Sequence, residues 1–265
     1  MQLDRIDLSD IHHPALLART VHKLLGKREG AVPVEDIAKA LDISEVRLDR
    51  FDGFEGMLLT DTVRSNGCIL ANSSKGRRRA RFTVAHELGH FLMERHQLSA
   101  ENGFTCSARD MRETRDGRQH MRQETQANQF AIELLAPDYL MEPFYSHDPD
   151  LRDAQCLRDH LDVSLEACVR RIVARRDEPL AAVWSHNGTV RYFAKSADFP
   201  SSRSIKAIRY RTHQPRIAQL PRGTPASRSL WRRTPTPGRA GRTSNSTSKR
   251  GSPTTDMQLR YFGPN

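Results

Sequence analysis

RFTVAHELGHFLM, residues 81–93, is the stretch of sequence around which the rest of the chain has to fold. Its apolar residues recur at helical spacing, with Leu88 and Leu92 one turn apart, and they predict a buried helix. The same helix carries His86 and His90 four residues apart, which puts their Cβ atoms about 5–6 Å from each other on one face. Two imidazoles at that separation can bind one metal ion.

Glu87 stands directly after the first histidine, and H-E-x-x-H on a helix is a zinc hydrolase signature. From that position its carboxylate reaches a water molecule bound to the ion rather than the ion itself. The pattern predicts zinc held by His86 and His90, with Glu87 as the general base for hydrolysis of a peptide bond. The alternative is a core helix with two histidines on its exposed edge, and a third ligand decides between the two interpretations.

Three residues compete for the place of the third ligand: His96, Glu94 and Glu124. His96 has the spacing of H-E-x-x-H-x-x-G-x-x-H, but that pattern needs a glycine where Met93 stands. Without a break, the helix carries His96 about 9 Å along its axis beyond His90, which is too far for a shared ion. Glu94 shares a face with the histidines, yet it lies a full turn beyond them and is expected in solvent.

Glu124 opens a run whose apolar residues follow the helical period as far as Pro137. Extended one turn back, that stripe reaches Glu124 itself, and a carboxylate on the packed side of a helix is unfavourable unless it is paired or bound to a metal. The alternative is an N-terminal helix residue stabilised by the helix macrodipole. Asn128 is a candidate to orient the carboxylate, whereas Glu133 falls on the opposite face and is expected in solvent.

Two blocks of this sequence, FTVAHELGHF at 82–91 and E-x-x-A-N-x-F-A-x-x-L-L-x-P at 124–137, resemble the ImmA/IrrE family of metallopeptidases. The two blocks together are specific to that family. The resemblance extends from residue 14 to about residue 200.

The resemblance implies a zinc ion bound by His86, His90 and Glu124, with Glu87 as the catalytic base. It also implies an endopeptidase that cleaves helix-turn-helix transcriptional repressors and so releases stress-response or mobile-element genes. The implied partner is therefore a DNA-binding protein substrate. Manganese or iron could replace zinc in purified material, because ligand geometry narrows the choice of metal without fixing it.

Patterns elsewhere predict an α+β fold: a mainly helical, zincin-like metallopeptidase domain with a small sheet. Helices are expected at 14–28 and 32–43, and two strands of a hairpin at 56–60 and 67–72. The strand at 67–72 could pair with an extended peptide substrate along its edge, although an ordinary core strand is the alternative. Residues 99–123 are polar and without period, and they predict a loop at the mouth of the site.

A pair of short helices is predicted at 151–161 and 165–173, with Ser164 as the N-cap of the second. The pair has a helix-turn-helix appearance, but packing against the peptidase domain is the favoured interpretation. A β-hairpin around Asn187-Gly188 follows. We therefore expect three parts, namely a metallopeptidase domain at 1–145, the helical pair plus hairpin at 146–198, and a tail at 199–265.

The net charge of +10 comes from the tail. Residues 199–255 contain thirteen Lys or Arg and no Asp or Glu, whereas residues 1–198 contain 28 basic and 31 acidic side chains. Direct nucleic-acid binding is therefore expected only weakly and only through the tail. Its richness in Arg, Ser, Thr, Pro and Gly predicts disorder, and it also fits a translated frameshift.

Two further features exclude whole classes of protein. No apolar run approaches about 18 residues and the N-terminus lacks a signal-peptide pattern, so we expect a cytoplasmic protein without membrane association. No two cysteines form a C-x-x-C pair, which argues against a disulfide framework and a second zinc site. The cysteines are Cys68, Cys106, Cys156 and Cys168, and Cys106 is expected to be a free thiol in the loop.

The rival prediction is a non-catalytic, DNA-associated regulator with a structural metal site, in which the helices at 151–173 bind DNA. Structural zinc is usually enclosed by four Cys or His ligands, whereas this set leaves a position for water beside a base, so the peptidase is favoured. A second group that stabilises the oxyanion is usual in such enzymes. The sequence does not choose among four candidates, which are His120, Tyr139, Tyr145 and His147.

Overall fold

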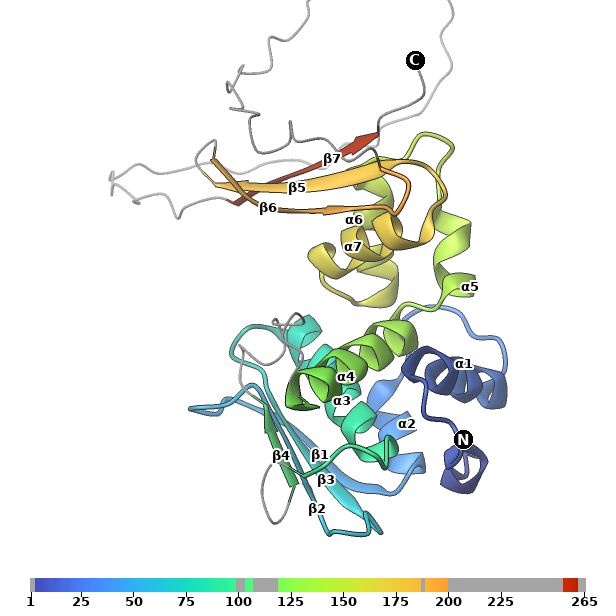
Figure 1. Ribbon diagram of the computed structural model, residues 1–265, viewed down its shortest axis with the longest axis vertical. Coiled ribbons are helices and arrows are strands. Elements are labelled where there is room, and N and C mark those ends of the chain that lie inside the picture. The colour runs from blue at the N-terminus through green and yellow to red at the C-terminus, as the bar shows by residue number, and fades with distance from the viewer. Residues whose placement is uncertain (1–2, 99–102, 107–118, 187–188, 200–254, 262–265) are drawn as a thin grey trace, which may run out of the picture.

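The computed structural model describes residues 3–98, 103–106, 119–186 and 189–199, together with the backbone of a strand at 255–261 (Figure 1). Helices and small sheets are combined in it, as the α+β prediction requires. The first part contains η1 (Arg5–Leu8), α1 (Pro14–Leu25), α2 (Val34–Ala40), β1 (Ile43–Asp49), β2 (Gly56–Thr60), β3 (Gly67–Asn72), α3 (Arg77–Leu92), β4 (Gly103–Cys106) and α4 (Gln119–Leu135). The second contains α5 (Asp138–Met141), η2 (Glu142–Phe144), α6 (Leu151–Leu161), α7 (Leu165–Arg175), β5 (Leu180–His186), β6 (Thr189–Lys195) and β7 (Thr255–Tyr261).

The first sheet has four strands in the order β1-β3-β2-β4. The hairpin prediction is confirmed, because β2 and β3 pair antiparallel with Gly56 opposite Ala71 and Thr60 opposite Gly67. The idea that β3 offers its edge to a substrate is wrong, since β3 is bonded to β1 on one side and to β2 on the other. The outer strands are β1 and β4, and a peptide could add only beside one of them.

The segment at 99–123 differs from the loop that its composition predicts. Residues 103–106 form β4 against β2, and α4 already begins at Gln119. The remainder of the segment lies outside the described residues. A four-residue strand is too short to show an alternating pattern, so the sequence gives no signal for it.

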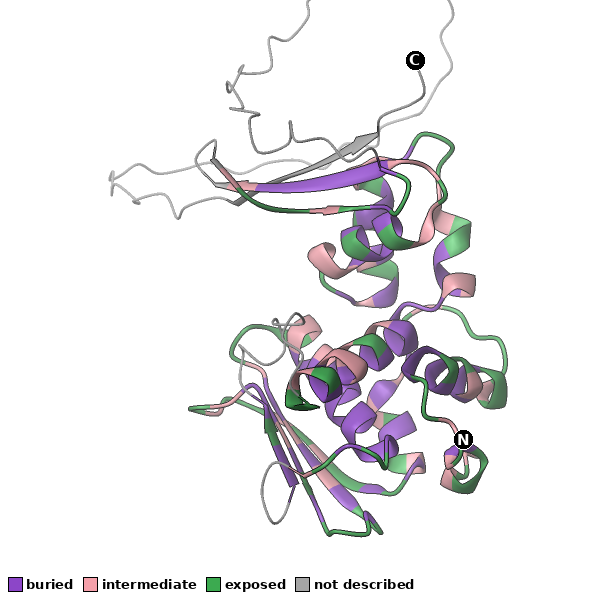
Figure 2. Ribbon diagram, in the orientation of Figure 1, coloured by how far each residue is buried: buried purple, intermediate pink, exposed green. Residues whose placement is uncertain are grey.

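The helix α3 lies between this sheet and α4 and is buried on nearly all sides (Figures 1 and 2). A helix enclosed in this way shows little amphipathic contrast and belongs to the core. Close approach of α4 depends on Gly89, because a Cβ there would lie 2.9 Å from Cδ1 of Phe130 and 3.4 Å from Cα of Ala127. Glu124, one turn before Ala127, is thereby brought to the histidine face of α3.

The helical pair α6 and α7 is attached to α4 through a buried ion pair. Arg171 of α7 donates to both carboxylate oxygens of Glu133, at 2.7 and 2.6 Å, and these two residues are 5% and 6% exposed. The expectation that Glu133 lies in solvent is wrong, because the guanidinium groups of Arg171 and Arg175 on α7 reach its carboxylate and cover it. This contact supports packing of the pair against the peptidase domain. Ser164 accepts from the Ala167 backbone N–H, as an N-cap should.

The second sheet has the order β6-β5-β7. Antiparallel pairing of β5 with β6 confirms the hairpin prediction, and the turn at 187–188 lies outside the described residues. The tail differs from its prediction at 255–261, where β7 pairs antiparallel with β5. That segment reads TDMQLRY, and its alternation of apolar and polar residues is concealed when composition is averaged over the tail. Residues 200–254 and 262–265 lie outside the described part.

Across the described part of the chain, no helix combines the length and apolar character that crossing a membrane requires.

Candidate metal centre

The helix α3 presents its two histidines to each other one turn apart. Nε2 of His86 lies 3.2 Å from Nε2 of His90, with the ring planes at 74°. Both side chains are inaccessible to solvent. The alternative of a core helix with histidines on an exposed edge is therefore wrong, and both imidazoles converge on one buried point.

Glu124 closes the third side of this point from α4. Its Oε2 lies 3.2 Å from Nε2 of His86 and its Oε1 lies 3.2 Å from Nε2 of His90. The helix begins at Gln119, more than one turn earlier, so a helix-end role does not explain the carboxylate. The structure therefore brings together the three residues that the sequence proposes as ligands.

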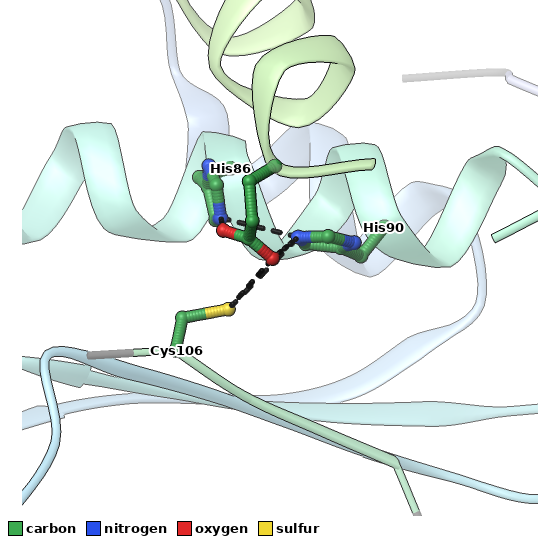
Figure 3. A group of neighbouring side chains, drawn as sticks. His86, His90 and Cys106 are labelled. Carbon is green, nitrogen blue, oxygen red and sulfur yellow. Dashed lines mark hydrogen bonds and ion pairs between the residues drawn. The ribbon is translucent and has the colours of Figure 1, made fainter. Parts of the chain in front are cut away.

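Cys106 is the member of the cluster that the sequence analysis missed. Its thiol lies 3.9 Å from Nε2 of His90 and donates to Oε1 of Glu124 at 3.9 Å. Figure 3 shows it reaching from the strand towards the two histidines of α3. One ligand atom from each of His86, His90, Cys106 and Glu124 lies within 4.8 Å of the others. No local pattern marks this cysteine, because its neighbours are supplied by the packing of β4 under α3.

The chemistry of these donors fits a zinc ion. Imidazole nitrogen, carboxylate oxygen and thiolate sulfur are the ligands that zinc takes in proteins. Zn–N bonds of about 2.0–2.1 Å at a tetrahedral angle separate two ligand atoms by about 3.4 Å, close to the 3.2 Å seen here. A buried cluster of titratable groups is unfavourable without such a partner, and within the described part of the chain Nδ1 of His86 has no hydrogen bond.

Electrostatics hold the proposed ligands in the forms that bind metal. Burial on its own raises the pKa of Glu124, but its close contacts with the imidazoles of His86 and His90 outweigh burial and hold that pKa well below its usual value. Burial lowers the pKa of His90 to about 4, against the opposing effect of the Glu124 carboxylate. At neutral pH the cluster thus offers a carboxylate and a neutral imidazole, and zinc binds both in these forms.

Glu87 lies beside the cluster rather than in it. Its side chain is fully buried, and neither carboxylate oxygen has a hydrogen-bond partner among the described residues. Burial raises the pKa of Glu87 well above the usual value, against the opposing effect of a contact with the Cys106 thiol and with a smaller contribution from the charge of Glu124. A carboxylate with a raised pKa is a stronger proton acceptor and is suited to act as a base during catalysis.

Room for that carboxylate is provided by Gly56 on β2. A Cβ at this position would lie 2.2 Å from Oε1 of Glu87 and 2.6 Å from Cγ2 of Thr83. We expect Gly56→Ala to displace the Glu87 carboxylate and to lower the turnover number by about tenfold or more, because small misplacements of catalytic groups have large kinetic effects. Metal content, measured on the same samples, is expected to stay unchanged. Normal turnover in the variant would contradict the placement of Glu87.

His96 lies next to His90 although the sequence places it out of reach. The prediction rested on an unbroken helix, but α3 ends at Leu92 and Met93 leaves the helical conformation with ψ at 88°. The buried Arg64 holds the following turn, since its guanidinium donates to the backbone oxygens of Met93 and His96. The ring of His96 comes back to the far side of His90, with the two Nδ1 atoms 3.0 Å apart.

This contact sets the tautomer of His90. Nε2 of His96 lies 3.1 Å from Oε1 of Gln126, and an amide oxygen can only accept, so His96 carries its proton on Nε2. Its Nδ1 is then an acceptor for the Nδ1 proton of His90. The lone pair of His90 consequently lies on Nε2, which faces the cluster. Partners of this kind orient the ligands of a metal site.

We expect His96→Ala to weaken metal binding by about 10-fold to 100-fold, the range typical for loss of such an orienting partner. Competition with a coloured zinc chelator measures the affinity. His12→Ala, which removes an exposed imidazole, is the matched control and should bind as the unmodified chain does. Equal affinities in all three proteins would show that His96 does not orient His90.

The other candidates from the sequence lie outside the cluster. Glu94 is exposed, as expected. Tyr139 contacts Nδ1 of His22 through its hydroxyl at 3.3 Å, and Tyr145 stacks under the guanidinium of Arg176. Two further histidines that were considered for the oxyanion are exposed, namely His120 and His147. None of these four residues lies at the cluster, so none of them is assigned as the group that stabilises the oxyanion.

Comparison with known proteins bears on the same region. A peptidase family model, described as the IrrE N-terminal-like domain, matches residues 39–173, just over half of the chain. No curated protein matches the sequence. A solved structure, "Mycobacterium tuberculosis transcriptional regulator", is 15% identical with a TM-score of 0.45 and matches 72% of this chain and 58% of that chain. The chain thus spans less than two thirds of that structure, and the likeness is too distant to carry an argument.

Proposed function

This chain belongs to the IrrE N-terminal-like family of peptidases, and from that premise we propose that it is a zinc-dependent endopeptidase. The observation that carries the proposal is the buried convergence of three ligand-type side chains from two helices, with a fourth carboxylate beside them. His86, His90 and Glu124 are the proposed ligands, and Glu87 is the proposed base.

The reaction is the hydrolysis of a peptide bond. When bound, zinc would supply a Lewis acid that makes a water molecule more acidic and polarises the scissile carbonyl. Glu87 accepts a proton from the attacking water and returns it to the nitrogen of the leaving amine. His96, through His90, keeps a lone pair directed at the cluster. Burial of the site strengthens each of these interactions because bulk water is excluded.

The proposed substrate is a helix-turn-helix transcriptional repressor, whose cleavage would release stress-response or mobile-element genes. Support comes from the resemblance of the two sequence blocks to the ImmA/IrrE family. The substrate is therefore a protein, and nucleic acid enters only as the partner of that protein.

A cleavage assay tests this function. The zinc-loaded chain is mixed with purified helix-turn-helix repressors from the same genome. We expect one repressor to be cut at a single new terminus, identified by mass spectrometry, and no cut after the metal has been removed. Equal cleavage of unrelated unfolded proteins would overturn the repressor as substrate. Absence of cleavage in every protein offered to the zinc-loaded chain would overturn the peptidase.

The second candidate function is a regulator that binds DNA and holds its metal only for structure. Its specific support is Cys106, which gives the cluster a fourth donor. Against it, Arg171 and Arg175 of α7 are paired with Glu133 and Asp138, so their charge is not presented to DNA. Retention of a DNA duplex by the full chain at physiological salt, together with lack of proteolysis, would favour this candidate.

A further inference from the structure

The thiol of Cys106 has no role in the three-ligand site proposed above. The residue is 1% exposed and forms no disulfide. Its sulfur is nevertheless directed at the same point as the proposed ligands from α3 and α4 (Figure 3). A buried thiol among ligand-type groups calls for an explanation, because a cysteine that only fills space would be surrounded by apolar side chains.

The distances correspond to a closed, four-ligand site. Nε2 of His86 and Nε2 of His90 are 3.2 Å apart, and each lies 3.2 Å from one of the two Glu124 carboxylate oxygens. The sulfur of Cys106 is 3.9 Å from His90 Nε2 and from Glu124 Oε1. With a Zn–S bond of about 2.3 Å, a tetrahedral zinc site needs about 3.6 Å along the edges that include sulfur. All four ligand atoms lie within 4.8 Å of one another, so a shift of about 1 Å or less would complete the tetrahedron.

A second observation identifies the position that the thiol occupies. Cys106 is paired with Gly56 across β4 and β2, and the Glu87 carboxylate lies over Gly56. The thiol thus lies next to both the ligand cluster and the fully buried Glu87, whose carboxylate it contacts. Catalysis needs a water molecule between the base and the ligands, and the sulfur lies close to the place that this water would take.

We propose that Cys106 is the fourth metal ligand of the resting chain and that it closes the site until it is displaced. The proposal rests on the function given above, because it concerns the same metal centre. Coordination replaces the S–H bond by a metal–sulfur bond and releases the proton to solvent. Displacement is structurally feasible, since β4 is four residues long and, within the described residues, is bonded only to β2.

Cobalt-loaded full-length chain provides the direct test, because cobalt(II) reports a bound thiolate by a sulfur-to-metal charge-transfer band in the near ultraviolet. We expect the band in the unmodified chain and in Cys68→Ser, a control on strand β3 of the same sheet. It should be absent in Cys106→Ser, with the visible cobalt bands retained. Visible bands without the charge-transfer band in the unmodified chain would overturn the proposal and leave the three-ligand site intact.

A second measurement tests whether the thiol blocks the open position. Acetohydroxamate binds at a free metal position and shifts the visible spectrum of cobalt. Suppose that the thiol is displaced from the metal in about a tenth of the unmodified molecules. Acetohydroxamate is then expected to bind about tenfold more tightly to Cys106→Ser, in which the position is always free. Equal affinity in the unmodified chain and the variant would show that Cys106 does not close the site. Failure of the unmodified chain to bind cobalt would instead overturn the metal centre itself.

Discussion

Replacement of Glu87 by glutamine is expected to abolish peptide-bond hydrolysis while the metal stays bound. Glutamine has nearly the same shape but cannot accept a proton, and loss of a general base lowers turnover by about 10²–10⁴-fold. The ligand cluster is spared, because Glu87 is not among the four side chains whose donor atoms converge. The rate of repressor cleavage and the elemental metal content are measured on the same preparation, and together they check both parts of the prediction.

Glu94→Gln is the matched control, since it makes the same change at an exposed position shortly after the end of α3. It is expected to cut at the normal rate. Undiminished cleavage by the Glu87→Gln protein would remove Glu87 from the mechanism, whatever its metal content. The inactive variant is also expected to retain substrate, so the intact repressor can be recovered with it.

Glu133→Ala is expected to lower the free energy of unfolding by about 3–5 kcal/mol, which is typical when one partner of a buried ion pair is removed. The change leaves Arg171 charged and buried between α4 and α7, with only Asp138 and the Ala136 backbone oxygen as acceptors. Arg175 loses its contact with the same carboxylate. Urea unfolding of the variant and the unmodified chain measures the difference.

Two further variants make that result specific. Glu166→Ala removes an ion pair with Arg170 whose partners are 45% and 49% exposed, and about 0.5 kcal/mol or less is expected from it. Replacing Glu133 and Arg171 together by methionine should destabilise less than Glu133→Ala, because no uncompensated charge remains. Equal effects of Glu133→Ala and Glu166→Ala would contradict a buried attachment of the helical pair to α4.

The sequence predicts the metal cluster to the extent that helical periodicity determines it. His86 and His90 share a face by spacing alone, and Glu124 is identified because a carboxylate continues an apolar stripe. The strands β2 and β3 carry local patterns and lie within the predicted bounds. Each of these predictions uses only the spacing of residues within a single helix or strand.

The residues that the sequence analysis missed depend on what covers an element from elsewhere in the chain. Periodicity places Glu133 opposite the metal-facing side of α4, but it does not reveal that Arg171 and Arg175 of α7 reach its carboxylate. His96 returns to His90 because Arg64 stabilises the turn after α3, and the sequence has no glycine there to indicate that the helix ends. Cys106 reaches the cluster from a four-residue strand under α3. Such contacts are set by tertiary packing and leave no local signal.

The most direct test of the central claim is elemental analysis of the full-length chain beside Glu124→Ala, both purified identically and dialysed against a weak chelator. A site shared by His86, His90 and Glu124 predicts about one zinc ion per unmodified chain and a large loss in the variant, because a ligand is removed. Manganese or iron in place of zinc would change the identity of the metal but not the site. Zinc retained equally by both proteins, or no metal in the unmodified chain, would contradict the account.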